Sequence, residues 1–157
     1  MKILFVCKHN RFRSKIAEAY FNKINENRGI QVYSAGVLIG TLIAKSVKQV
    51  ARKLGFSVKG KPKGIKDKLL KEIDLLVIVA DDVPEELFKK KVEKIFVWNI
   101  PDVEQSNLDK IEEISRKIME RVDELNVILK GKWQKLKFQH KYKTGVLHND
   151  IRISQRF

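Results

Sequence analysis

Residues 2–24 read KILFVCKHNRFRSKIAEAYFNKI and carry the clearest fold signal in the chain. Its first six residues are almost all apolar and end at Cys7, which is typical of a strand buried within a sheet. After a short polar loop, apolar side chains recur at spacings of three and four residues, the period of one helix face, at Ile16, Ala17, Tyr20, Phe21 and Ile24. We therefore predict a strand, a loop and a helix that ends at Gly29.

The rest of the chain repeats this alternation of strand-length apolar runs and amphipathic segments. The predicted strands are 2–7, 30–35, 73–80 and 94–98, and further helices are predicted at 43–54, 84–90 and 106–130, with a loop at 56–66. Such alternation indicates an α/β fold, in which a parallel sheet is covered by helices on both faces. We find no internal repeat.

The composition suits one compact domain without disulfides. The chain has 157 residues, and no apolar run approaches the roughly 18 residues that cross a bilayer. Its one cysteine cannot form an internal disulfide, which favours a reducing, cytoplasmic location, and no Cys/His cluster suggests a metal. The formal net charge of +14 favours anionic partners: a phosphorylated substrate, nucleic acid or an acidic membrane surface.

Cys7 and Arg13 flank five residues at the junction between the first strand and the first helix. Free backbone N–H groups and the positive end of the helix dipole make such a loop a natural anion site. The same dipole and Arg13 favour the thiolate of Cys7, the nucleophilic form, while Arg13 can hold two phosphate oxygens. Ser14 could donate a hydrogen bond to that sulfur. The competing interpretation is that Cys7 is a small buried apolar residue at a strand end.

This segment resembles the active-site loop of the low-molecular-weight protein tyrosine phosphatases and the related arsenate reductases. The resemblance includes Asn10 in the loop and Arg13-Ser14 followed by Ala17-Glu18-Ala19. It extends over residues 1–130 and includes Ser34-Ala35-Gly36 and Trp98-Asn99-Ile100-Pro101-Asp102. The resemblance implies a flavodoxin-like three-layer sandwich with a four-stranded parallel sheet.

The resemblance also implies residue roles: Cys7 is the nucleophile, Arg13 binds phosphate, Ser14 tunes the sulfur, Asn10 braces the loop with Ser34 in support, and Asp102 is the general acid. The implied phosphate-binding loop is Lys8, His9, Asn10, Arg11, Phe12, Arg13 and Ser14. Expected ligands are a phosphorylated protein or a small phosphate ester, with phosphate, sulfate or arsenate as ligand or inhibitor. No cofactor and no metal are expected.

Several positions depart from the family pattern. The acid is usually followed by proline, whereas Asp102 is preceded by it, so Asp81 and Asp82 after the third predicted strand remain alternatives. Arsenate reduction through thioredoxin needs further cysteines, which leaves only a variant that uses a small external thiol. Residues 37–43 supply no aromatic side chain, so tyrosine specificity is not indicated unless Phe12, Trp98 or the tail supplies an aromatic wall.

Residues 131–157 lie beyond the resemblance, and Gly131 marks the predicted boundary between a catalytic domain, 1–130, and a basic, aromatic extension, 131–157. Alternation at 136–138 and 151–153 predicts a hairpin around Thr144-Gly145 that packs on the domain or on a partner. Lysine and arginine interleaved with aromatic residues also fit nucleic acid. A phosphate- or nucleic-acid-binding module without catalysis is therefore the alternative to the enzyme.

Overall fold

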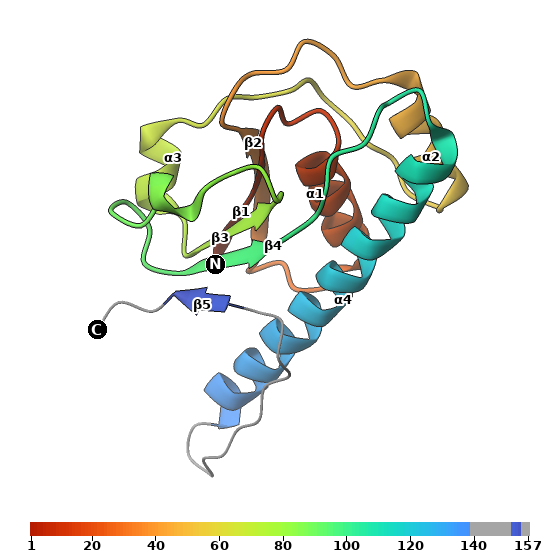
Figure 1. The fold of residues 1–157 in the computed structure, drawn as a ribbon. Helices are drawn as coiled ribbons and strands as arrows, with labels where there is room; N and C mark the ends of the chain where they lie inside the picture. Colours follow the sequence, from red (N-terminus) through yellow and green to blue (C-terminus); the bar gives the residue numbers. More distant parts are fainter. Residues whose placement is uncertain (139–151, 155–157) are drawn as a thin grey trace.

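The computed structural model describes residues 1–138 and 152–154, which form a sheet between two layers of helices (Figure 1). Four strands run parallel in the order β2-β1-β3-β4, and the short strand β5 pairs antiparallel with the free edge of β4. The strands are β1 Lys2–Cys7, β2 Gln31–Gly36, β3 Leu75–Val79, β4 Ile95–Trp98 and β5 Arg152–Ser154. The predicted α/β fold with a four-stranded parallel sheet is confirmed.

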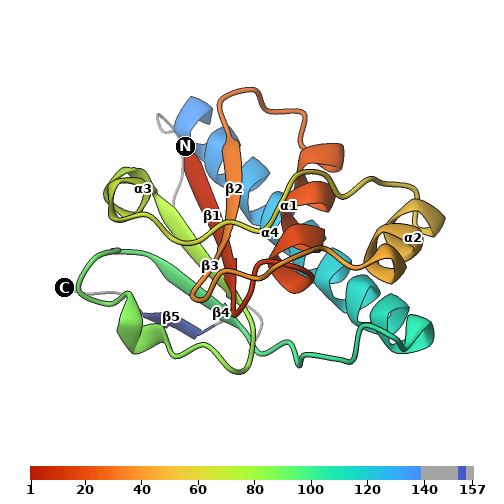
Figure 2. The ribbon, with the colours of Figure 1, turned by 90° about the horizontal axis from the view of Figure 1, so that it is seen from above.

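Helices cover both faces of the sheet (Figures 1 and 2). One face carries α1 Arg13–Ile24, α2 Lys45–Lys53 and α4 Leu108–Phe138, with α4 packed on both of the others. The opposite face carries α3 Asp67–Glu72 and the 3₁₀ turn η1 Glu85–Leu87. The molecule therefore has the three layers expected of a flavodoxin-like sandwich.

Each face of the sheet has its own apolar core because successive strand residues point to opposite sides. In β1, Ile3 and Phe5 pack under α1 and α4, whereas Leu4 and Val6 face the layer that contains α3. All four side chains are fully buried. A strand buried on both faces needs a continuous apolar run, which explains why residues 2–7 were recognisable from the sequence.

Local polar groups move some element ends away from their predicted positions. Helix α1 ends at Ile24 rather than at Gly29, because the Asn25 side chain accepts a hydrogen bond from the N–H of Asn27 and donates to its carbonyl, which closes a turn. The predicted helix at 84–90 is only the turn η1, and α3 was not predicted at all. Gly55 ends α2 as predicted, with the positive φ of 85° that a Schellman cap requires.

Helix α4 is longer than predicted and continues through Gly131 to Phe138. One glycine costs a helix only about 1 kcal/mol, which does not stop a long helix anchored by its apolar face. The strand predicted at 136–138 is therefore wrong, since these residues are helical. The centre of the predicted hairpin, Thr144-Gly145, lies outside the described residues, and the domain boundary at Gly131 stays a prediction.

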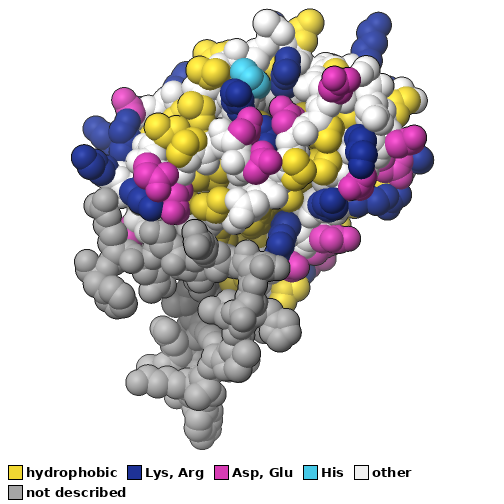
Figure 3. Space-filling view, viewed as in Figure 1, with side chains coloured by type: hydrophobic (Ala, Val, Ile, Leu, Met, Phe, Trp, Pro, Cys, Tyr) yellow, Lys and Arg dark blue, Asp and Glu magenta, His cyan; other side chains and the backbone are white. Residues whose placement is uncertain are grey.

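Surface charge is mixed rather than segregated on the face drawn in Figure 3, where basic and acidic side chains stand beside one another. Ion pairs of the molecule include Lys2 with Glu72 and Lys89 with Glu85. Despite the net charge of +14, the coloured, described part of this face carries no single basic field. Among the described residues, no helix has the length and apolar character needed to cross a membrane.

Candidate active site

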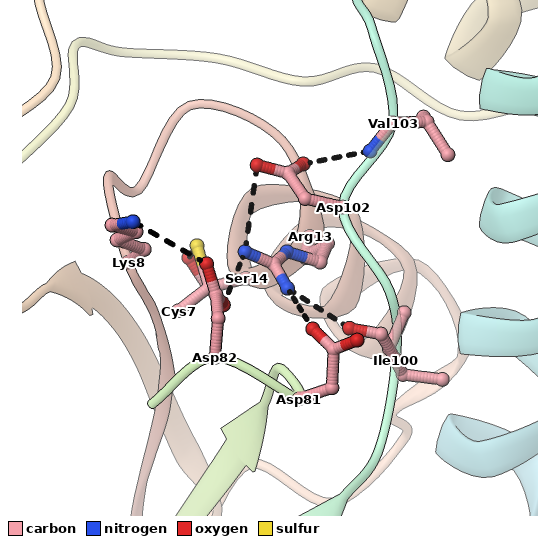
Figure 4. A network of polar contacts seen from close by, with 9 residues as sticks. All are labelled: Cys7, Lys8, Arg13, Ser14, Asp81, Asp82, Ile100, Asp102 and Val103. Atoms are coloured by element: carbon pink, nitrogen blue, oxygen red, sulfur yellow. Dashed lines mark hydrogen bonds and ion pairs between the residues drawn. The ribbon is translucent and has the colours of Figure 1, made fainter. Parts of the chain in front are cut away.

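The loop after β1 lies at the point where the sheet order reverses, with β2 on one side of β1 and β3 on the other. Crossover connections leave a crevice at the carboxyl ends of the strands there, and ligands of open α/β sheets bind in it. Three strand ends contribute side chains to this crevice: Cys7 from β1, Asp81 and Asp82 from the segment after β3, and Asp102 from the segment after β4. Figure 4 shows these groups around Arg13, the first residue of α1.

Cys7 is buried, and its sulfur lies 3.0 Å from the hydroxyl oxygen of Ser14. Asn10 holds this pair from behind: its Nδ2 donates to Ser14 Oγ at 2.8 Å and to Ser34 Oγ at 2.9 Å. Its Oδ1 accepts from the backbone N–H of Lys63 at 2.8 Å. Asn10 also has a positive φ of 52°, a conformation that asparagine tolerates better than most residues and that curves the loop.

Glu18 and the Asn10 amide together fix the direction of these hydrogen bonds. A carboxylate only accepts hydrogen bonds, so the Ser34 hydroxyl must donate its single proton to Glu18 Oε2, at 2.6 Å. Ser34 then accepts from Asn10, and both N–H bonds of the Asn10 amide are used. Because Ser14 also accepts from Asn10, its own proton is free for the sulfur of Cys7. The Asn10 amide therefore makes Ser14 a donor to Cys7, the arrangement that stabilises a thiolate, and Glu18 anchors Ser34 at the far end of the network.

We predict that Glu18→Gln slows alkylation of Cys7 by iodoacetate by about three- to tenfold, the equivalent of one weakened hydrogen bond. A glutamine amide lacks the carboxylate charge that accepts the Ser34 proton, so Ser34 is held less firmly and Asn10, which donates to both Ser34 and Ser14, is braced less rigidly. Glu120→Gln, an exposed site on α4, makes the same substitution outside this network. Thermal unfolding of both variants separates loss of reactivity from loss of fold. Equal alkylation rates in the wild type and both variants would contradict the role of Glu18.

Arg13 is the most constrained cation of the site, with 2% of its surface exposed. Its Nη1 donates to the carbonyl of Ile100 at 2.9 Å and lies 3.4 Å from Asp81 Oδ1. Its Nη2 donates to Asp82 Oδ1 at 2.8 Å and lies 3.6 Å from Asp102 Oδ2. Contacts from two further strand ends thus aim the guanidinium across the mouth of the loop (Figure 4).

Asp102 lies beside Arg13, with 39% of its side chain exposed and its Oδ1 accepting from the N–H of Val103. It also brings Asp81 and Asp82 to the same guanidinium, so all three carboxylates weighed from the sequence meet there. Asp82 lies in addition 3.8 Å from the ammonium of Lys8. Position alone does not separate the three, but of these three carboxylates only Asp102 lines the open cavity of about 570 Å³ beside the loop, which Arg11 also lines.

The remaining loop residues lie at different depths. Lys8, His9 and Arg11 are partly exposed at the mouth, whereas Phe12 is buried in the core beneath α1. Trp98 is buried in the same core, so neither ring forms the aromatic wall that the sequence left open. The side chains of the tail aromatics lie outside the described part of the chain.

The segment after β2 packs directly against the loop backbone. Leu38 N–H donates to the carbonyl of Lys8, and Gly40 N–H donates to that of His9. Gly36 has no room for a side chain, because a Cβ there would lie 2.7 Å from the carbonyl carbon of His9. This close approach exposes an aliphatic rim beside the loop, made of Val37, Leu38, Ile39 and Leu42.

Sequence reasoning missed three contributors: Glu18, Lys63 and the carbonyl of Ile100. Glu18 stood within the family-like triplet Ala17-Glu18-Ala19, which was a usable signal. Lys63 and Ile100 act through their backbones, and backbone groups leave no signal in a sequence.

Comparisons with known proteins agree with this geometry. A family model described as low molecular weight phosphotyrosine protein phosphatase matches residues 2–135. The chain is similar to a YwlE mutant from Bacillus subtilis (22% identity, 83% of this chain and 99% of that one, TM-score 0.73). It is similar to an arsenate reductase from Archaeoglobus fulgidus (29% identity, 79% of this chain and 98% of that one, TM-score 0.66). It is also similar to a low molecular weight protein tyrosine phosphatase from T. tengcongensis (23% identity, 83% of this chain and 99% of that one, TM-score 0.70). This chain belongs to the low molecular weight phosphotyrosine protein phosphatase family.

Proposed function

We propose that the protein hydrolyses phosphate monoesters through a phosphocysteine on Cys7. The observation that carries this proposal is the sulfur of Cys7 held 3.0 Å from Ser14 in a loop whose last residue is the buried Arg13. Family membership supports a phosphatase or arsenate reductase type of chemistry. A YwlE arginine phosphatase mutant with a phosphorylated active-site serine is a precedent, in that protein, for a covalent phosphoryl group.

In the first step, the loop N–H groups and Arg13 bind the phosphate dianion, which displaces Asp82 from the guanidinium. The Cys7 thiolate attacks phosphorus, so the S–P bond forms while the bond to the ester oxygen breaks. Asp102, in its acid form, gives its proton to that leaving oxygen. Arg13 stabilises the charge on the three equatorial oxygens as the phosphoryl group transfers.

In the second step, the Asp102 carboxylate takes a proton from a water molecule, whose oxygen attacks phosphorus. The new P–O bond forms, the S–P bond breaks, and orthophosphate leaves. Ser14 donates to the sulfur as it regains its negative charge, so the same hydroxyl assists both halves of the reaction. The residues invoked here supply nucleophile, acid, base and phosphate clamp.

The substrate side of the site is aliphatic and mixed in charge. The rim of Val37, Leu38, Ile39 and Leu42 offers apolar contact, and Arg11 and Glu104 line the cavity next to Asp102. These features suit a phosphorylated protein segment or a small phosphate ester. They differ from a flat aromatic slot. Inorganic phosphate, sulfate and arsenate should compete for the loop, as the structure of the tyrosine phosphatase Wzb from Escherichia coli K30 with sulphate illustrates for that protein.

The test is hydrolysis of para-nitrophenyl phosphate by the purified chain in the presence of a metal chelator. We expect turnover that the chelator does not change and that arsenate and phosphate inhibit competitively. Absence of turnover across mildly acidic and neutral pH would reject the proposal.

Alkylation provides an independent prediction. Iodoacetate should modify one equivalent of thiol, since Cys7 is the only cysteine, and inactivate the protein. Free phosphate should slow this reaction in proportion to occupancy of the loop, because a bound anion covers the sulfur. Mass spectrometry and residual activity follow the two events. Alkylation at the same rate with and without saturating phosphate would place the thiol outside the anion site.

Arsenate reduction with a small external thiol is the second candidate, favoured by the single cysteine and by the similarity to an arsenate reductase. Cys7 would form an S–As bond with loss of hydroxide, and an external thiol RSH would attack the Cys7 sulfur. Arsenic then leaves as arsenite with the electron pair of the S–As bond, and Cys7 becomes a mixed disulfide that a second RSH reduces. Arsenite formation with glutathione and arsenate, measured beside phosphate release, decides between the two.

A further inference from the structure

A second cavity, of about 510 Å³, lies between α1 and the segment that joins α2 to α3, away from Cys7. Figure 2 shows this segment crossing α1 on its way to the far layer. Four lysines line the cavity, Lys15, Lys23, Lys59 and Lys63, against a single acid, Glu18. The proposed reaction uses none of the four lysine side chains, so their convergence needs another explanation.

Among the four lysines, Lys15 needs an explanation most, because only 2% of its surface is exposed. Burial of an ammonium group is costly unless its charge and its three N–H donors are matched. Its only hydrogen-bond partner in the described part of the chain is Glu18, at 3.3 Å, and that carboxylate oxygen already receives Ser34 at 2.6 Å. Gly60 leaves space in front of the ammonium, since a Cβ there would lie 3.9 Å from Lys15 Nζ. A buried cation therefore borders the cavity with unused donors.

The other three lysines add charge that the described residues do not neutralise. Within residues 1–138, no carboxylate lies within ion-pair distance of Lys23, Lys59 or Lys63. Elsewhere in the described part of the chain some lysines are paired, as Lys53 is with Glu112 and Lys91 with Asp67, and others are not, so it is the gathering of unpaired lysines at one cavity that matters. Unpaired lysines gathered around one cavity repel one another, and that repulsion disappears when an anion binds between them.

We propose that this cavity is a second anion site that takes a linear oligophosphate group, free or as part of a nucleotide. Several lysines spread around a space of about 510 Å³ match several linked phosphates better than one, and the volume is within the range of small-molecule sites. Buried Phe56 forms one apolar wall of the cavity, against which a nucleoside could pack. This site is separate from the proposed catalytic function and needs no turnover.

The cavity borders the scaffold of the phosphate loop. The backbone N–H of Lys63 donates to Asn10, and Lys15 contacts the Glu18 carboxylate that orients Ser34. An occupant would thus touch the residues that brace the loop without touching Cys7.

The test is an NMR titration of the full ¹⁵N-labelled chain with inorganic tripolyphosphate. We expect saturable shifts of the Ser57 and Gly60 amides, in addition to any shifts of loop amides such as His9. The double variant Lys23→Gln/Lys59→Gln should weaken binding at Ser57 and Gly60 by about tenfold or more, and leave binding at His9 unchanged. The matched double variant Lys68→Gln/Lys94→Gln removes the same charge from exposed positions outside the cavity and should change neither.

Two results would overturn the proposal: shifts confined to the phosphate loop, or equal weakening by both double variants, which would mean general attraction to a basic surface. A parallel titration with adenosine triphosphate separates the sources of the ligand. If adenosine triphosphate binds more tightly than tripolyphosphate, the site is assigned to nucleotides. If it binds equally or more weakly, the site is assigned to free oligophosphate. Because binding is read directly, an inactive enzyme would leave this test intact.

Discussion

Cys7→Ser should lower kcat for para-nitrophenyl phosphate by on the order of 10⁴- to 10⁶-fold, the loss found when an enzyme nucleophile is removed. A serine hydroxyl is nearly isosteric with the thiol but is scarcely ionised at neutral pH, so the attacking anion is missing. Ser14, Asn10 and Arg13 keep their positions, and the variant should therefore still bind phosphate. Steady-state kinetics gives the loss, and isothermal titration with phosphate shows whether the loop is intact.

A rapid-quench experiment makes this prediction sharper. The wild type should release about one equivalent of para-nitrophenol before steady state if hydrolysis of phosphocysteine is slower than its formation, and the trapped phosphoryl group should map to residue 7. The single cysteine makes that mapping unambiguous. Residual activity above about 1% in Cys7→Ser, with phosphate binding retained, would mean that another group attacks phosphorus.

Asp102→Asn should slow hydrolysis of phenyl phosphate by about 10²- to 10⁴-fold, the usual contribution of a general acid. Phenolate is a poor leaving group that needs the proton, whereas para-nitrophenolate leaves without much assistance. The loss with para-nitrophenyl phosphate should therefore be far smaller in the first half-reaction. The measurement is single-turnover release of each phenol, which isolates formation of phosphocysteine from its hydrolysis.

Asp81→Asn and Asp82→Asn are matched controls, because both carboxylates contact the same Arg13 guanidinium. Their effects should not depend on the leaving group. Asp82→Asn should also lower KM, because the Asp82 carboxylate pairs with Arg13 and lies near Lys8. Without that negative charge, the two cations attract the dianionic substrate more strongly. A strong leaving-group dependence in Asp82→Asn, or equal losses for both substrates in Asp102→Asn, would transfer the acid role away from Asp102.

Much of the fold was readable from the sequence because its signals are local. A doubly buried strand must be continuously apolar, so residues 2–7 and 73–80 were recognised, although β3 itself spans only Leu75–Val79. The apolar stripe of α4 was equally plain up to residue 130. What failed was of two kinds: short elements such as α3, which are too brief for a periodic pattern, and element ends. The end of α1 depends on the Asn25 side chain, and α4 continues through Gly131, the predicted domain boundary.

For the candidate site, the loop from Cys7 to Arg13 can be located without a structure, since the thiol, the strand end and the helix start are neighbours along the chain. The groups that surround this loop depend instead on how the chain packs. Asp81, Asp82 and Asp102 reach Arg13 from two other strands, and the parallel sheet brings their carboxyl ends to one edge. The burial of Lys15 and the direction of bonds from Glu18 likewise depend on contacts with β2 and with the segment before α3. Covalent neighbours follow from chain order, but partners far apart in sequence follow only from packing.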